Sequence, residues 1–207
     1  MLANETLVAQ DGYEVALFPM EVLYMTQDEG GDYSHAGTYN IDFVGTYNRY
    51  PLYAPCKLVI RRIVPDSNGL ILDSVNPVHL PNGDVDYITL LVAHDNNPIS
   101  MTVGHVFDQG ELFYHTGTYG FVTGDHVHMC IGQGAGGTLV QRTGGNWDLS
   151  NRIHMWDGLF VNDTTIIQGY GHDWRVWDEP TPPPPTQTRK KHKFPFVIAK
   201  HHWQGWN

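Results

Sequence analysis

The sequence predicts a fold made mainly of β-strands, and three observations support this. Only 16% of its 207 residues are charged, which disfavours long amphipathic helices. The 22 Gly and 13 Pro instead supply many turns between short strands. A hydrophobic content of 41%, with 12% aromatic residues, indicates a globular chain that can bury a sizeable core.

Charge is distributed unevenly along the chain. The formal net charge is −10, yet five of the twelve Lys and Arg lie after residue 185, where there is no Asp or Glu. We therefore expect no nucleic-acid binding by the acidic body. The longest apolar runs are too short to span a bilayer.

The two cysteines, Cys56 and Cys130, could form a disulfide or remain as two thiols, and their spacing allows both. The absence of a signal peptide favours free thiols in a protein that folds in a reducing cytosol.

Alternating apolar residues place the expected strands along the chain. The first spans 18–25 and is entered through a proline, and the stretch 53–60 has the composition of an edge strand broken by a proline. Residues 85–94 have the composition of a central strand, and a shorter strand is expected at 111–115.

Turns and loops separate these strands. Residues 28–32 form an acidic loop, 66–69 a turn and 132–137 a glycine-rich loop, and the turn at 81–84 predicts a hairpin. Residues 153–178 carry three tryptophans and are expected to close the domain. We interpret His154 and His172, which lie in that stretch, as structural or surface residues.

One stretch suited to metal binding or catalysis is Thr-Gly-Asp-His-Val-His-Met at 123–129. In an extended strand His126 and His128 point to the same face, about 7 Å apart at their Cα atoms. Two imidazoles on one face suggest a metal or catalytic site, although a bare His-x-His also occurs by chance.

His35 and Asp42 form a second such stretch, because a turn at Gly37 can bring them together. Asp42 lies at the start of an apolar strand, where an unpaired carboxylate is costly. A metal, an arginine or backbone amides would satisfy it, and a turn-capping Asp beside a surface His is the alternative. His94 ends the central strand and fits a structural role as well as a functional one.

Together these residues give a two-His, one-carboxylate set, made of His35, Asp42 and His128, which Zn²⁺ accepts readily. Three protein ligands leave a fourth position for water, whose pKa the metal would lower while it polarises a carbonyl. His94 and His126 would remain as unligated imidazoles, suited to proton transfer and to stabilising an oxyanion.

The order and context of these residues resemble a known family. The glycine-spaced run from 107 to 130, ending in Thr-Gly-Asp-His-Val-His, resembles the His-x-His motif of the lysostaphin and LytM-type M23 metallopeptidases. His-Ala-Gly at His35, followed by Asp42, resembles their first ligand motif, and Val-Ala-His at His94 resembles their isolated catalytic histidine.

The longer separation of His35 and Asp42, with six residues between them, departs from the commonest members. This spacing, together with the sequences Phe-Pro-Met, Ile-Asp-Phe-Val-Gly and Tyr-Ala-Pro-Cys, is similar to the M23 domain of tail-tip (knob) peptidoglycan hydrolases. Those proteins belong to small short-tailed phages of Gram-positive bacteria.

The resemblance implies an antiparallel β-sheet core with zinc in a groove walled by the loops 28–34, 66–84 and 132–146. It implies cleavage of peptide bonds in peptidoglycan stems or cross-bridges by a virion protein at a phage tail tip, which opens the host wall for genome entry. It also implies roles for five residues: His35, Asp42 and His128 as zinc ligands, and His94 and His126 as catalytic histidines.

The expected organisation is an extension at 1–17, a peptidase domain at 18–178, a proline-rich linker at 179–188 and a basic, apolar tail at 189–207. The tail is too short to fold alone, so we expect it to dock onto phage tail proteins or a neighbouring copy. Electrostatic attachment to anionic wall polymers is the alternative.

Two other functions compete with this one. A structural or receptor-binding plug could keep the fold without chemistry, but it would not need five retained chemical residues. A free lytic enzyme for host release would be expected to carry a wall-binding repeat after the linker, and the tail has none that is recognisable.

Overall fold

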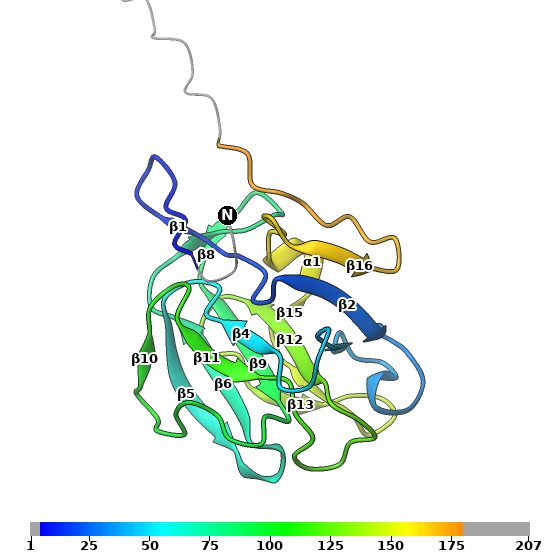
Figure 1. Cartoon of the computed structure of the whole chain (residues 1–207). Helices are drawn as coiled ribbons and strands as arrows, with labels where there is room; N and C mark the ends of the chain where they lie inside the picture. The colour runs from blue at the N-terminus through cyan, green and yellow to red at the C-terminus, as the bar shows by residue number, and fades with distance from the viewer. Residues whose placement is uncertain (1–4, 180–207) are drawn as a thin grey trace, which may run out of the picture.

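The computed structural model describes residues 5–179 and confirms the predicted mainly β fold. Figure 1 shows the strands of one large sheet running through the body, with a short helix, α1 (Met155–Gly158), beside it. The predicted tail, and the linker from residue 180 onward, lie outside the described residues.

The main sheet contains nine of the described strands, and its neighbours are antiparallel except for the parallel pair of β2 and β16. Across the sheet, eight of them follow one another as β10 (Val106–Phe107), β5 (Leu58–Val64), β6 (Gly69–Ser74), β9 (Ile88–Ala93), β12 (Val127–Gln133), β3 (Ile41–Phe43), β2 (Val22–Gln27) and β16 (Thr165–Gln168). The ninth, β15 (Arg152–Ile153), pairs with β12.

Smaller sheets and two 3₁₀ turns complete the described elements. They are the three-stranded β1 (Glu14–Val15), β7 (Val78–His79) and β8 (Val85–Asp86); the pair β4 (Pro51–Tyr53) and β11 (Leu112–His115); the pair β13 (Leu139–Gln141) and β14 (Trp147–Leu149); and the turns η1 (Tyr33–His35) and η2 (Pro65–Ser67).

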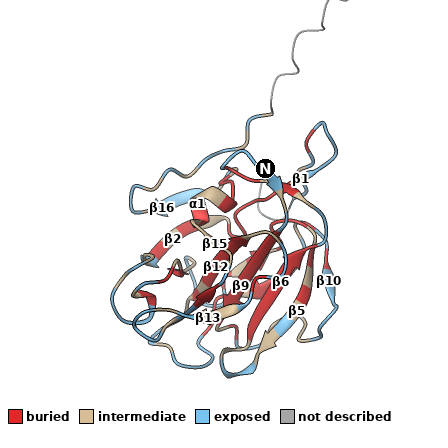
Figure 2. Cartoon of the chain, turned by 180° about the vertical axis from the view of Figure 1, so that it is seen from behind, coloured by how far each residue is buried: buried red, intermediate tan, exposed pale blue. Residues whose placement is uncertain are grey.

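The central strands β6 and β9 are buried along their whole length (Figure 2). Leu72 and Leu90 belong to the main core on one face of the sheet. Leu91 packs on the other face in a second cluster, with Cys130 and Leu149. Because both faces are covered, β9 is almost entirely apolar rather than alternating, and its buried polar residue, Thr89, donates a hydrogen bond to Asp73.

Several predictions about local structure are confirmed. The segment 85–94 contains the central strand β9, the turn at 81–84 joins β7 and β8 in a hairpin, and the segment 111–115 contains β11. The turn at 66–69 joins β5 to β6, with Asn68 in the left-handed conformation. Both cysteines are buried free thiols, and they lie in different hydrophobic clusters.

Other expectations need correction. The first predicted strand, at 18–25, begins only at Val22, because the backbone of Phe18 hydrogen-bonds to Phe160 outside the sheet. The stretch 53–60 is not one edge strand. Its proline lies in the connection between β4 and β5, and β5 is an internal strand between β10 and β6.

The two ends of the described chain pack together on the body. Ala16 contributes to the main core, while Leu17 and Phe160 share a smaller cluster with Val15. Among residues 5–179 no helix is both long and apolar enough to cross a membrane.

Candidate metal centre

The sheet register places two of the predicted ligands opposite each other. Asp42 in β3 is the cross-strand partner of His128 in β12, and β12 is flanked on its other side by β9. Directly opposite residues on one face of an antiparallel pair have Cβ atoms about 5 Å apart, which is within reach for their side chains. The ladder therefore fixes the separation of these two groups through the backbone.

His35 reaches the same point from a loop. It ends η1, and the chain then turns through Gly37, whose φ of +75° favours glycine, to enter β3. The side chain of His35 is fully buried, although it lies outside the sheet. The turn predicted between His35 and Asp42 is thus present.

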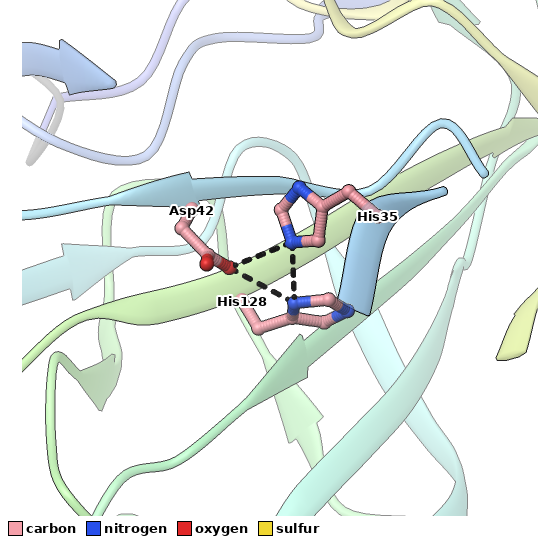
Figure 3. Close-up of side chains that lie close together, drawn as sticks. All are labelled: His35, Asp42 and His128. Carbon is pink, nitrogen blue, oxygen red and sulfur yellow. Dashed lines mark hydrogen bonds and ion pairs between the residues drawn. The ribbon is translucent and has the colours of Figure 1, made fainter. Parts of the chain in front are cut away.

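The three side chains converge on one another, as Figure 3 shows. His35 Nε2 lies 3.2 Å from Asp42 Oδ1 and 3.2 Å from His128 Nδ1. His128 Nδ1 lies 2.9 Å from Asp42 Oδ1. The three polar atoms form a small, nearly equilateral triangle.

The hydrogen bonds around His35 set its tautomer. Its Nδ1 donates to the backbone carbonyl of Asp28, at 2.9 Å, so in the neutral ring Nε2 carries a lone pair towards Asp42 and His128. Burial raises the pKa of Asp42, but the contacts of its carboxylate with His128 and His35 outweigh this, so the pKa lies well below its ordinary value. Asp42 is therefore ionised at neutral pH.

This arrangement fits a zinc ion. His35 Nε2, Asp42 Oδ1 and His128 Nδ1 point at one another. When both imidazoles are neutral, at most one of these three atoms, His128 Nδ1, carries a proton. Tetrahedral zinc, with bonds of about 2.0–2.1 Å, would hold its ligand atoms roughly 3.3 Å apart. The triangle already has nearly that size, and a cation would replace the missing protons.

His94 lies beside this triangle, immediately after β9, with a φ of +91° that is uncommon for a residue other than glycine. Its Nδ1 donates to the carbonyl of Tyr119, at 2.9 Å, and its ring centroid is 4.8 Å from that of His126 and 5.9 Å from that of His128. Burial, aided by these two histidines, lowers its pKa to about 4. His94 is therefore neutral at pH 7, with Nε2 as an acceptor.

His126 precedes β12 and forms an isolated β-bridge with Gly117. Its Nδ1 donates to the carbonyl of Gly124, at 2.9 Å, and its Nε2 lies 3.7 Å from Asp42 Oδ1. Both His94 and His126 thus have Nδ1 tied to a backbone carbonyl, which leaves Nε2 free to exchange a proton.

A cavity of about 590 Å³ opens at this centre and includes His94 and His128 in its lining. Ser34, Asp66 and Asn146 also line it. The predicted groove loops need correction, because 66–84 contains the strands β6 and β7, and 132–146 contains the end of β12 and the strand β13. The sequence interpretation missed several other lining residues, among them Arg62, Phe121 and Trp147. The exposure of Phe121 and Trp147, both large aromatics, becomes visible only in the folded chain.

Comparison with known proteins gives a relative in a phage. No family model matches the chain. It is 36% identical over 167 residues to Morphogenesis protein 1 of Bacillus phage B103, and the match covers 81% of this chain and 46% of the relative. The chain thus spans about half the length of that curated protein.

Solved structures overlap with the chain in part. Lysostaphin of Staphylococcus simulans has a TM-score of 0.41 at 14% identity, covering 58% of this chain and 49% of its own. LytU has a TM-score of 0.40 at 22% identity, covering 56% and 77%. A zinc-containing peptidase of Vibrio cholerae has a TM-score of 0.39 at 16% identity, covering 61% and 42%. Because these structures overlap with the chain only in part and at low identity, we infer its function from the residues of the site.

Proposed function

We propose that this chain is a zinc-dependent endopeptidase of the M23 type that cleaves peptide bonds in peptidoglycan stems or cross-bridges. The observation that carries this proposal is the triangle of His35 Nε2, Asp42 Oδ1 and His128 Nδ1 at the edge of an open cavity. The resemblance of the His35, Asp42 and His128 motifs to those of M23 metallopeptidases supports the same conclusion.

His35, Asp42 and His128 would hold the metal, which supplies a Lewis acid able to activate a water molecule and to polarise the scissile carbonyl. His94 and His126 provide the proton chemistry. One Nε2 accepts a proton from the attacking nucleophile, and the other, once protonated, donates to the oxygen on which charge develops. Their Nδ1 bonds to the carbonyls of Tyr119 and Gly124 keep both rings oriented for this exchange.

We further propose that the protein acts at a phage tail tip, where it opens the host wall for genome entry after folding in the host cytoplasm. The similarity to a phage protein named for morphogenesis supports a place in the phage particle. Residues 189–207 would then bind phage tail proteins or a neighbouring copy.

Mass analysis of fragments from cell wall digested with the full chain tests the activity and identifies the bond together. We expect new amino termini at one type of peptide bond, and we expect a chelator or His128→Ala to abolish their appearance. Cleavage that survives both treatments would contradict the proposal. If the natively purified protein contained no zinc and cleaved nothing, a structural plug would be the better description.

A further inference from the structure

Five side chains form one continuous stack next to the loop that carries His35. The guanidinium carbon of Arg152 lies 4.1 Å from the centroid of the Tyr39 ring. Tyr39 then stacks on His154 at 4.4 Å, His154 on Trp156 at 4.7 Å, and Trp156 on His172 at 3.7 Å, with interplanar angles of 15°, 8° and 13°. We call these five residues the ring stack.

The two imidazoles of the ring stack bind adjacent carboxylates of the loop. His172 Nε2 lies 2.9 Å and 3.0 Å from the two carboxylate oxygens of Asp28. His154 Nδ1 lies 2.7 Å from Glu29 Oε1. Because Trp156 lies between the two histidines, the C-terminal segment holds the loop at two consecutive residues, one on each side of the indole.

Asp28 connects the ring stack to the proposed metal centre. Its carboxylate binds His172, and its backbone carbonyl accepts the Nδ1 proton of His35. That second bond fixes the tautomer in which Nε2 of His35 is free to bind a metal. A shift of Asp28 would therefore turn the His35 ring or release its tautomer, although Asp28 itself would not coordinate the metal.

We propose that His172 is a positioning residue for the metal centre, and that it acts through Asp28 on His35, with Trp156 and His154 holding it in place. This inference rests on the proposed zinc function and extends it to residues 152–172, which would set part of the affinity for zinc. Partners of a metal ligand that lie one contact further out typically change metal affinity by about 10-fold to 100-fold when they are removed.

The chain offers a matched control in a second pair of a histidine and an aspartate. His79 Nε2 lies 2.9 Å and 3.0 Å from the carboxylate oxygens of Asp11, and its ring lies 4.8 Å from that of Trp177. The same chemical arrangement of imidazole, carboxylate and indole is therefore present, but its carboxylate lies in the N-terminal segment and not in the loop of His35.

The test is a competition titration of zinc against a chelator on the purified full chain. We compare wild type, His172→Ala, His172→Gln and His79→Ala, with thermal unfolding of each metal-free protein measured alongside. We expect His172→Ala to weaken zinc binding by about 10-fold or more. His172→Gln, which keeps a donor for Asp28, should restore most of the affinity, and His79→Ala should bind zinc as wild type does.

Several outcomes would overturn the inference. Unchanged affinity in His172→Ala, or an equal loss in His79→Ala, would show that the ring stack does not act on the metal centre. If wild type itself bound no zinc, the proposed function and this inference would both fail. Should His172→Ala not fold, Asp28→Ala removes the same side-chain contact and keeps the backbone carbonyl that binds His35, and wild-type zinc affinity in that variant would count against the proposal.

Discussion

The sheet and the loop hold their parts of the metal centre in different ways. Asp42 and His128 occupy opposed positions on β3 and β12, so backbone hydrogen bonds fix their separation. His35 lies in a loop, and its position depends on the turn at Gly37 and on the carbonyl of Asp28. The comparison shows that the proposed centre would combine two rigidly placed ligands with a third whose position depends on groups elsewhere in the chain.

The two proposed catalytic histidines, His126 and His94, also differ in how they are held. His126 is tied to the sheet by its bridge to Gly117, directly before β12. His94 follows β9 in a left-handed conformation that its neighbours hold, with its backbone amide bound to Ser67 and its carbonyl bound to Tyr119. Strain of this kind in a non-glycine residue often accompanies functional sites.

Loss of the sheet-borne ligand should give the largest effect. In His128→Ala two ligands remain, so we expect zinc to be lost and cleavage to fall on the order of 10³-fold or more, since a metal contributes several kcal/mol to such a reaction. Metal content and rate of wall digestion measure this. His105→Ala, an exposed histidine packed on Phe107, is the control and should keep both.

Loss of His126, the proposed catalytic histidine next to the metal, should lower the rate of cleavage without changing zinc binding. In His126→Ala all three proposed ligands remain, so zinc content should match that of wild type. Cleavage should fall by about 10²- to 10⁴-fold, the usual contribution of a general acid or base. A variant that lost its zinc would instead place His126 among the ligands.

A substitution in the turn at Gly37 should disturb only the position of His35, the proposed ligand that lies in the loop. An alanine at Gly37 has a strained φ, and its Cβ would lie 2.9 Å from the carbonyl oxygen of Thr143. Gly104→Ala carries a similar φ strain, at +89°, with open space around it. We expect each variant to lose about 1–2 kcal/mol of stability.

Zinc affinity, measured by competition with a chelator, should distinguish the two variants. We expect zinc affinity to fall several-fold in Gly37→Ala and to stay unchanged in Gly104→Ala. The reason is that Gly37, unlike Gly104, lies in the segment that connects His35 to β3. Equal affinities in the two variants would mean that the turn does not control the position of His35.

The smallest expected effect is on the pH dependence of stability, through the ionisation of Glu29 in the loop that precedes His35. Burial raises the pKa of Glu29 from its ordinary value of 4.5, although the pairing with His154 opposes this. A carboxyl group that binds its proton more tightly in the folded chain contributes stability below that ordinary pKa. The contribution is lost as pH rises through the raised pKa.

Glu29→Gln keeps a hydrogen-bonding group near His154 and removes this titration. We expect its melting temperature to vary less than that of wild type as pH rises from the ordinary pKa of a glutamate towards neutrality. Parallel curves for the two proteins over that range would contradict the prediction. Such curves would mean that Glu29 does not titrate differently in the folded chain.

Features that depend on local sequence were predictable. The alternation of side chains in a strand is enough to put His126 and His128 on one face, and the glycine between His35 and Asp42 is enough to indicate a turn. The nearly continuous apolar run of β9, interrupted by Thr89, identified a central strand, because a strand covered on both faces is apolar on both of them.

Features that depend on contacts between distant parts of the chain could not be predicted from the sequence. The place of β5 inside the sheet depends on β10, which lies more than forty residues further along the chain. The groove residues Arg62, Phe121 and Trp147 come from three separate segments and share no motif. His154 and His172 were expected to be structural or surface residues, and their pairing with Glu29 and Asp28 carried no sequence signal.

The sequence by itself thus determined the strand-rich fold and the residue types of the centre, since turn formation, strand periodicity and metal-ligand chemistry are properties of short segments. Only the tertiary structure decided which groups hold those residues in place. Asp28 and His172, for example, are 144 residues apart, and they meet because the C-terminal segment packs beside β2. Long-range packing of this kind depends on the whole core, and no short stretch of sequence encodes it.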